Sequence, residues 1–165
     1  MMKVRRFIGL FFINKIFKGT RFFFIKYKLA IFSGIKLGHN VKIVGPIIMG
    51  NCVELEIGDE SWVGRDLKIY GNGSVIIGKN CDLAPDVSFY TGGHIVGMST
   101  RRAGEGTTYK IKIEDGCWIC GSVKFFNNIV VSSGSIIALG SVVGHDCEPN
   151  SVYAGVPAIK KKDLF

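Results

Sequence analysis

Residues 113–148 read IEDGCW ICGSVK FFNNIV VSSGSI IALGSV VGHDCE, and this stretch reveals the fold. Position one of every hexad is Ile, Phe or Val, and position five is Cys, Val, Ile or Ser. A period of six differs from the period of about 3.6 of an α-helix and from the simple alternation of a strand. It is typical of hexapeptide repeats, in which three hexads form one triangular coil of a parallel β-helix and position one fills the interior.

Hexads also occur upstream of this stretch. They predict coils at residues 57–76 and 77–94 and a less regular coil at residues 37–56. The sequence therefore predicts an all-β fold, a left-handed parallel β-helix of about five coils over residues 37–148. Pro149 ends the period, so residues 149–165 are expected to form a C-terminal cap and tail. A chain of 165 residues is long enough for one such domain and too short for two.

The departures from the period all fall in the third segment of a coil. This segment has two extra residues in the first and second coils, and eighteen residues, 95–112, follow His94 before the period resumes. Insertions at one edge of a rigid scaffold are typical of a binding cleft. Residues 95–112 are predicted to form an extruded loop; the alternative is an ordinary coil, since eighteen residues equal one full turn.

The N-terminal segment, residues 1–32, differs from the rest in charge. Residues 1–30 contain eight Lys or Arg and no acidic residue, whereas the remainder contains thirteen of each sign, so the net charge of +8 belongs to this segment. The balanced body gives no reason to expect a nucleic-acid partner. The apolar runs are too short for a membrane span. An apolar stripe of helical spacing is formed by Val4, Phe7, Ile8, Phe11 and Phe12.

Two roles remain open for this basic amphipathic helix. It can lie on an anionic membrane surface, or it can pack against the body or a neighbouring subunit.

Five cysteines are present, and Cys117 and Cys120 form a CxxC motif. A zinc or redox site is one interpretation of this motif. However, Cys81, Cys117 and Cys147 share one position of the repeat, where small residues are required. We interpret them as small buried hydrophobic residues, and we predict no metal.

The chain resembles a known enzyme family from about residue 37 to residue 162. The resemblance rests on the repeat together with APDVSFYTGGH (84–94), IEDGCWICGSV (113–123), IALGSVV (137–143) and NSVYAGVPAIKKK (150–162). These motifs resemble the hexapeptide-repeat acyltransferases, and among them the acetyl-CoA-dependent O-acetyltransferases of the maltose, galactoside and polysaccharide type. The resemblance implies acetyl-CoA as donor, a homotrimer, and active sites between adjacent prisms.

The resemblance also implies that His94, which precedes the extruded loop, is the catalytic base. An imidazole can take the proton of an acceptor hydroxyl as the hydroxyl attacks a thioester. The alternative is a histidine on a surface turn. A zinc hydratase of the γ-carbonic anhydrase type is disfavoured, because His39, His94 and His145 lie 55 and 51 residues apart.

Further site residues follow from the same resemblance. In this family, one set of residues lines the surface along which the pantetheine arm of the coenzyme lies, here called the donor lane, and another residue stands beside the acyl group. The matching positions here are Gly121, Leu139, Gly144 and His145 for the donor lane and Trp118 for the acyl site. One of Lys160, Lys161 and Lys162, taken as Lys160, is expected to contact the coenzyme phosphates; a solvated tail is the alternative. The alternative is that the glycines at these positions only allow the chain to turn at the corners of the β-helix.

The resemblance does not assign the acceptor, because Gly64 and Asn72 replace the Asn and Asp that galactoside-type enzymes use. The nearest polar candidates for acceptor binding are Asp66, Asn72 and Asp82. The sequence predicts acetyl transfer to a hydroxyl of a sugar, with a polysaccharide or a lipid-linked glycan at the cytoplasmic face of a membrane as the expected substrate. The alternatives are a soluble acceptor such as serine or a free sugar, and a non-catalytic trimeric scaffold.

Overall fold

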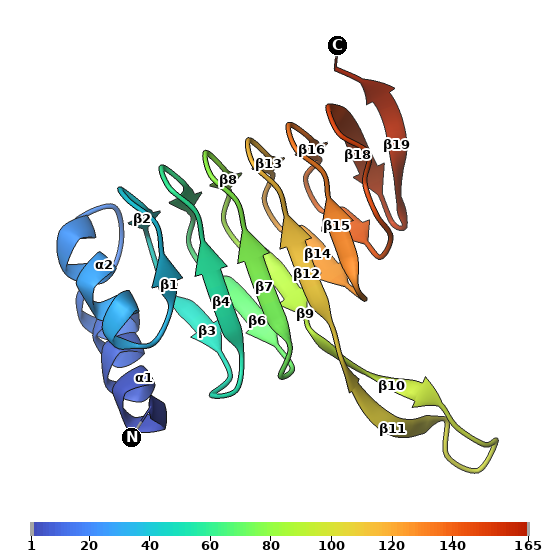
Figure 1. The fold of residues 1–165 in the computed structure, drawn as a ribbon, viewed down its shortest axis with the longest axis horizontal. Helices are drawn as coiled ribbons and strands as arrows, with labels where there is room; N and C mark the ends of the chain where they lie inside the picture. Colours follow the sequence, from blue (N-terminus) through green and yellow to red (C-terminus); the bar gives the residue numbers. More distant parts are fainter. Residues whose placement is uncertain (1, 165) are drawn as a thin grey trace.

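Position one of the hexads faces the interior in every repeat, as the period predicts. The six residues at this position in residues 113–148 are fully buried, and they are Ile113, Ile119, Phe125, Val131, Ile137 and Val143. The position-five residues of the same hexads are buried as well. In the computed structural model, which describes residues 2–164, the chain forms a β-solenoid with three sheets as its sides (Figure 1).

Each sheet receives one short strand from each of five coils, and these strands pair in parallel. Sheet A contains β1 (Lys36–Leu37), β4 (Glu54–Ile57), β7 (Ser74–Ile77), β12 (Lys110–Ile113) and β15 (Ile129–Val131). Sheet B contains β2 (Lys42–Ile43), β5 (Trp62–Val63), β8 (Asp82–Leu83), β13 (Trp118–Ile119), β16 (Ile136–Ile137) and β18 (Ser151–Gly155). Sheet C contains β3 (Ile47–Met49), β6 (Leu67–Tyr70), β9 (Ser88–Tyr90), β14 (Lys124–Phe126) and β17 (Val142–Val143).

The solenoid has about six turns, one more than the sequence predicted. Five coils contribute a strand to all three sheets, and β18 adds a sixth strand to sheet B alone. The last strand, β19 (Ala158–Asp163), turns back and pairs with β18 in antiparallel fashion. This hairpin covers the C-terminal end of the solenoid, and it lies within the cap expected at residues 149–165.

The strand register confirms where the insertions lie. On sheet B, Trp62 pairs with Asp82, which is twenty residues further along the chain. Asp82 pairs with Trp118 after thirty-six residues, and Trp118 pairs with Ile136 after eighteen. The extra residues leave the solenoid between sheets C and A, at an edge that we call the C–A corner. The prediction that one edge carries all the insertions is confirmed.

The long insertion is an antiparallel hairpin rather than an irregular loop. Its strands are β10 (Gly92–Val96) and β11 (Ala103–Thr108), and they project from the body (Figure 1). The excursion therefore begins at residue 92, three residues before the predicted loop of residues 95–112. Residues 110–112 belong to β12 because Ile111 and Ile113 alternate inward and are both fully buried.

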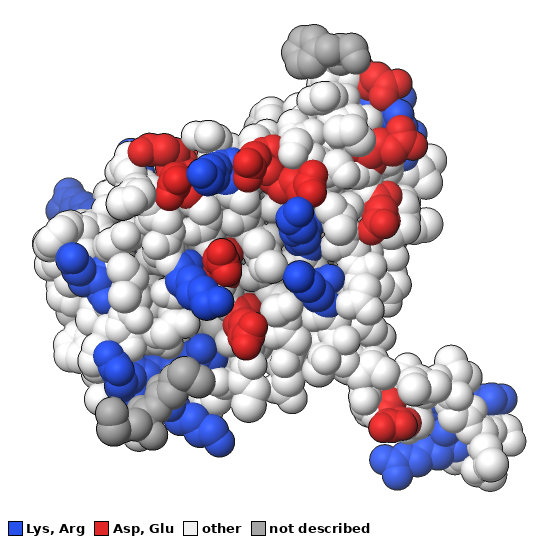
Figure 2. All heavy atoms as spheres, in the orientation of Figure 1, with Lys and Arg blue, Asp and Glu red and all other residues white. Residues whose placement is uncertain are grey.

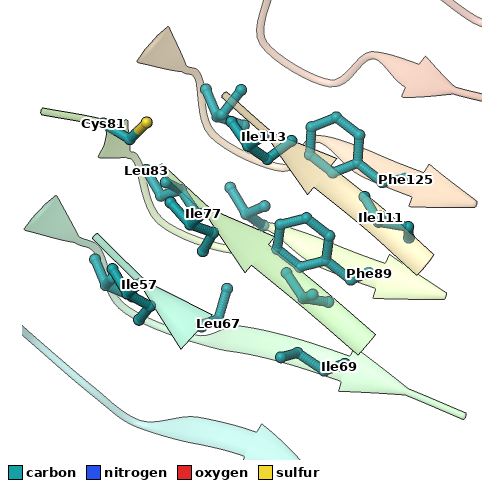
Figure 3. Close-up of a cluster of buried hydrophobic side chains, with 14 of the residues drawn as sticks. Ile57, Leu67, Ile69, Ile77, Cys81, Leu83, Phe89, Ile111, Ile113 and Phe125 are labelled. Carbon is teal, nitrogen blue, oxygen red and sulfur yellow. The ribbon is translucent and has the colours of Figure 1, made fainter. Parts of the chain in front are cut away.

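The interior is a set of side-chain stacks that run along the solenoid (Figure 3). Ile57, Ile77 and Ile113 lie in register on sheet A. On sheet C, the rings of Phe89 and Phe125 stack with centroids 5.0 Å apart and an angle of 14° between their planes. The stacks make a stiff column, since every coil fills the space above the previous one.

The N-terminal segment folds into two helices instead of the single one predicted. These are α1 (Met2–Phe11), which continues into the π-helical turn η1 (Phe12–Ile16), and α2 (Phe23–Phe32). They cover the first coil, at the end opposite to β19 (Figure 1). Helices α1 and α2 touch at Gly9, where a Cβ atom would lie 2.8 Å from the Leu29 carbonyl oxygen. Among the described residues, no helix has the length and apolarity needed to cross a bilayer.

The predicted apolar stripe of α1 does not pack on the body. Val4, Phe7, Ile8, Phe11 and Phe12 are all exposed. The buried side of the segment instead contains Arg6, Gly9, Leu10 and Ile13. Packing against the chain's own body is therefore excluded as the role of this stripe.

Two buried cations hold the helices on the open end of the solenoid. The Arg6 guanidinium donates to the carbonyl oxygens of Ser33, Gly50, Asn51 and Val53 at 2.7–3.1 Å. The Lys26 ammonium donates to the carbonyl oxygens of Gly19 and Val44. Burial lowers the pKa of Lys26. Carbonyls at the end of a stack of coils have no next strand to bond, so these side chains satisfy them.

Candidate active site

A cavity of about 460 Å³ lies at the C–A corner, where the hairpin leaves the body. Its walls come from β6, β9, the two hairpin strands and the short turn after β6. The lining residues are Tyr70, Gly71, Asn72, Tyr90, Gly92, Gly93, His94, Gly106, Thr107 and Thr108. This cavity contains two of the residues singled out in the sequence, His94 and Asn72.

His94 lies on β10, and its ring is held by the other strand of the hairpin. Its Nδ1 atom is 2.8 Å from the carbonyl oxygen of Gly104. A carbonyl oxygen only accepts hydrogen bonds, so Nδ1 must carry the proton and donate it. In the neutral imidazole this leaves Nε2 unprotonated. The ring is exposed, and its free nitrogen is an available base.

The hairpin is anchored to the body by Thr91 and Tyr109, at the points where the chain leaves and returns. The amide of Tyr109 donates to the carbonyl oxygen of Thr91 at 2.8 Å, and the Thr91 hydroxyl donates to Tyr70 O at 2.9 Å. The ring of Tyr109 packs on Gly93, where a Cβ atom would stand 2.2 Å from the tyrosine hydroxyl oxygen. The hairpin therefore emerges from a rigid base.

The two acidic acceptor candidates lie outside this cavity. Asp66 occupies the turn between sheets B and C, the B–C corner, with Arg65 Nε 3.9 Å away. Asp82 lies on sheet B, where it pairs with Trp62 on one side and with Trp118 on the other. Of the three predicted acceptor residues, only Asn72 shares a cavity with His94 in one chain.

Three of the six predicted coenzyme residues lie on sheet B or at the B–C corner. Trp118 is 54% exposed on sheet B. Gly121 and Leu139 are vertical neighbours, as their spacing predicted: a Cβ atom on Gly121 would lie 3.1 Å from Leu139 Cδ1. The side chain of Leu139 is 76% exposed. Small and accessible positions in two successive coils leave room for a flexible chain to lie along this corner.

The remaining coenzyme candidates lie at the C–A corner and on β19. Gly144 is covered by the ring of Phe126, whose Cζ atom would be 2.1 Å from an added Cβ. His145 is exposed, with its ring centroid 6.0 Å from that of Tyr153.

The Lys160 ammonium already has two partners in this chain. Its Nζ atom lies 2.6 Å from Glu148 Oε2 and 2.6 Å from Asp163 Oδ1. These carboxylates raise the pKa of Lys160, Asp163 most of all. Lys161 and Lys162 are exposed. A phosphate would have to compete with both carboxylates for Lys160.

The structure gives no support to a zinc or redox site at the cysteines. All five cysteines are free thiols, and Cys81, Cys117 and Cys147 are buried at the repeat position predicted for them. Burial raises the pKa of the Cys147 thiol to about 12. Within residues 2–164, no group of three or more His, Cys, Asp and Glu side chains could hold a metal ion.

Sequence analysis missed Tyr70, Tyr90 and Thr107 among the cavity residues. The two tyrosines are twenty residues apart, which equals the repeat in the enlarged coils, so the sequence contained a signal for their stacking. Thr107 gave no such signal because its position depends on the pairing of the hairpin strands.

Comparison with known proteins places the chain in a family, although no family model matches it. The galactoside O-acetyltransferase of Escherichia coli is 31% identical over 121 residues, which cover 73% of this chain and 60% of that protein. The chain spans about half to two thirds of the length of curated relatives that it matches.

Solved structures extend the likeness to the N-terminal helices. A hexapeptide-repeat acetyltransferase of Vibrio cholerae, crystallised with acetyl coenzyme A, is 25% identical with a TM-score of 0.83; the match covers 99% of this chain and 87% of that one. The polySia-specific acetyltransferase NeuO is 26% identical with a TM-score of 0.70, over 79% of this chain and 61% of that one. Given its hexad period, its solenoid and these relatives, the chain belongs to the hexapeptide-repeat acetyltransferase family of the galactoside, maltose and polysaccharide O-acetyltransferase type.

Proposed function

We propose that the protein transfers an acetyl group from acetyl-CoA to a hydroxyl of a sugar, with His94 as the general base. The observation that carries this proposal is the hydrogen bond from His94 Nδ1 to the Gly104 carbonyl oxygen. It leaves Nε2 unprotonated beside a cavity large enough for a small acceptor. The acetyltransferase relatives support the donor and the reaction class.

The chemistry requires one base and one proton path. Nε2 of His94 accepts the proton of the acceptor hydroxyl as the oxygen attacks the thioester carbonyl carbon. Collapse of the tetrahedral intermediate breaks the carbon–sulfur bond, and the thiolate of coenzyme A takes the proton back from the imidazolium. The Gly104 carbonyl stabilises the imidazolium during this cycle, because Nδ1–H continues to donate to it.

The direct test measures release of coenzyme A thiol with a panel of sugar acceptors. His94→Ala should lower kcat by about two to four powers of ten, because a general base contributes that much. His39→Ala is the matched control, since His39 lies at an exposed turn between sheets A and B. Thiol release that is unchanged in His94→Ala would exclude His94 as the base, and the absence of release with every acceptor would favour the scaffold alternative.

We further propose a homotrimer whose active sites form between two chains. His94 lies at the C–A corner, whereas Trp118, Gly121 and Leu139 lie on sheet B and at the B–C corner. Of the predicted coenzyme positions, Gly144 and His145 share the C–A corner with His94, whereas these three lie away from it. A second chain that presents its B–C corner to the hairpin would bring these three positions to His94 of the first chain. The exposed hairpin side chains Ile95 and Val96 support such a contact.

Subunit mixing tests this arrangement. His94→Ala removes the base, and Gly121→Trp fills the donor lane, so each variant alone should be inactive. Co-expressed chains should regain part of the activity, because one interface in a mixed trimer combines an intact base with an intact lane. Failure to regain activity, although the mixed oligomers form, would place the whole site in one chain.

A sugar acceptor is favoured over serine by the cavity wall. The described residues that line it in one chain include no Lys, Arg, Asp or Glu. The ammonium and carboxylate of serine would each need a charged or strongly bonding partner, and an unpaired ion is costly to desolvate. A polyhydroxylated ligand needs only the hydroxyl, amide and backbone groups that are present.

The N-terminal helices are proposed to bind an anionic membrane, which would bring the enzyme to lipid-linked glycans at the cytoplasmic face. Residues 1–53 contain ten Lys or Arg and no Asp or Glu. Phe7 and Phe24 are 70% and 73% exposed, respectively. Other exposed apolar residues in this segment are Val4, Ile8, Phe11, Phe12, Ile16, Phe22, Ile25, Ile31 and Phe32. On the face drawn in Figure 2, Lys and Arg but no acidic side chains lie over these helices.

Aromatic and basic side chains on one surface are the pattern of interfacial membrane binding. The basic and aromatic surface of the N-terminal helices also covers one end of the solenoid. In a trimer whose solenoid axes are parallel, the three copies of this surface would therefore face the same membrane plane. Simultaneous binding of three copies would strengthen a membrane contact that is weak for one chain.

Vesicle sedimentation tests the membrane contact on the full chain. Wild type should sediment with vesicles of phosphatidylglycerol and phosphatidylethanolamine, and less with phosphatidylcholine alone. The double variant Phe7→Ser, Phe24→Ser should lose binding, whereas Ile159→Ser, on exposed β19 at the opposite end, should keep it. A smaller oligomer in the double variant, without a change in sedimentation, would instead identify this surface as a subunit contact.

A further inference from the structure

Two tyrosines form a stacked pair at the rim of the His94 cavity. Tyr70 ends β6 and Tyr90 ends β9, and the two residues are register partners on sheet C. Their ring centroids are 5.2 Å apart with an angle of 28° between the planes. They are 43% and 40% exposed, so the pair keeps a large apolar surface in contact with solvent.

The outer face of the Tyr70 ring is not covered by a side chain from the preceding coil. Met49 pairs with Ile69, so the position below Tyr70 belongs to Gly50. A glycine there leaves open the space that a side chain of the ladder would fill. In the coil that follows Tyr90, the register partner Phe126 leans over Gly144, towards the far end of the column. The tyrosine pair is therefore a separate aromatic surface and not part of a continuous ladder.

Asn72 supplies a polar side chain to the same cavity. Its amide group can both donate and accept hydrogen bonds. Thr107 also lines the cavity, but its Oγ1 atom is buried from solvent, so it is not counted as a ligand-binding group.

Building on the proposed function, we propose that Tyr70 and Tyr90 bind the pyranose ring of a neutral acceptor sugar, and that Asn72 hydrogen-bonds its hydroxyls. This assigns the acceptor class: a neutral hexose or N-acetylhexosamine unit rather than an acidic sugar.

The chemistry of a pyranose matches both parts of this surface. One face of the ring presents C–H groups with a partial positive charge, which pack on the negative face of an aromatic ring. The equatorial hydroxyls point outward from the edge, where the Asn72 amide can pair with them. A sugar seated in this way brings a hydroxyl into the cavity that His94 lines.

The wall that one chain supplies to the cavity has no Lys or Arg to pair with an acidic sugar. Its ten lining residues include no Lys, Arg, Asp or Glu. Against this wall, the carboxylate of a uronic or sialic acid would lose hydration without gaining a Lys or Arg partner. This preference would distinguish the chain from the polySia-specific acetyltransferase NeuO.

Steady-state kinetics with neutral methyl glycosides provide the first test. Tyr70→Ala and Tyr90→Ala should each raise the KM of the acceptor about tenfold, because aromatic stacking contributes roughly that much, while the KM of acetyl-CoA stays constant. Tyr70→Phe should retain most of the affinity. Ile48→Ala, an exposed apolar residue on the same sheet but outside the cavity, is the matched control. An unchanged acceptor KM in both alanine variants would overturn the proposal.

Binding without the donor separates this inference from the proposed function. Saturation-transfer NMR with methyl glycosides should show contact between ring protons and the wild-type protein, and the contact should be lost in the Tyr70→Ala, Tyr90→Ala double variant. Methyl glucuronoside should bind about tenfold more weakly or worse. If the protein binds the methyl glycosides but transfers no acetyl group to them, the proposed reaction is contradicted and the proposed sugar-binding surface is not. Equal binding of the acidic glycoside, or loss of the oligomer in the double variant without loss of glycoside binding, would refute the tyrosine platform.

Discussion

The Nδ1 atom of His94 lies 2.8 Å from the carbonyl oxygen of Gly104, across the two strands of the hairpin. The hydrogen bond links a side chain on the outgoing strand to the backbone of the returning strand. Because the backbone carbonyl cannot be removed by substitution, its position must be changed instead. The orientation of the imidazole therefore depends on the geometry of the whole hairpin.

Gly104→Ala should impair catalysis through this hydrogen bond. A Cβ atom at this position would lie 2.7 Å from the Ile95 carbonyl oxygen, so the strands must move apart and displace the acceptor of Nδ1–H. We expect kcat to fall about tenfold, consistent with loss of one hydrogen bond to a charged group, with little change in the KM of acetyl-CoA. Glu105→Ala, on the same strand with an exposed side chain, should keep normal kcat. A Gly104→Ala enzyme with wild-type kcat would contradict this role.

Phe125→Ala should be strongly destabilising, whereas Phe126→Ala should not. Phe125 is fully buried and stacks on Phe89, so its removal leaves a cavity in the column and is expected to cost about 3–5 kcal/mol of unfolding free energy. Phe126 points outward and is 39% exposed, and its loss should cost about 1 kcal/mol or less. Urea unfolding monitored by circular dichroism provides the measurement. Similar costs for both variants would mean that the inward stack contributes no special stability.

Arg6→Ala should detach the N-terminal helices from the first coil. The guanidinium satisfies four carbonyl oxygens, and its removal leaves several of them buried without a donor. The expected loss is about 2–5 kcal/mol of unfolding free energy.

Arg5→Ala is the control for this change, since the exposed Arg5 guanidinium only lies 4.8 Å above the Phe32 ring. A loss of about 1 kcal/mol or less is expected there. Hydrogen exchange should show faster exchange in α1 and α2 of Arg6→Ala. Protection equal to that of wild type would contradict the anchoring role.

Lys161→Ala and Lys162→Ala should weaken coenzyme binding more than Lys160→Ala. Lys160 is already paired with Glu148 and Asp163, whereas its two neighbours are exposed. An exposed lysine that meets a phosphate should raise the KM of acetyl-CoA about threefold when it is removed, and added salt should reduce the difference. Acetyl-CoA titrations at two salt concentrations measure this effect. A larger effect for Lys160→Ala would show that the phosphate displaces its carboxylate partners.

The hexad period predicted the solenoid correctly because its cause is local and repeated. Every inward side chain in residues 113–148 must fit inside the coil and stack on the next one, so Ile113 and Val131 lie in register eighteen residues apart. The same counting located the insertions at the C–A corner. The end of the predicted loop, residue 112, was too late because Ile111 follows strand alternation within β12, which the hexad count alone does not include.

Other features depend on contacts between distant residues. The helical spacing of α1 predicted an apolar stripe, yet the buried side is the one that contains Arg6, because only folding brings the carbonyls of residues 50–53 within its reach. The sequence by itself determined the family, the column and His94 as a candidate base, since these follow from short periodic motifs. Only the tertiary structure joined Tyr70, Tyr90, Asn72 and Thr107 around that histidine and supplied the Gly104 carbonyl, because stacking of coils and pairing of hairpin strands are long-range contacts.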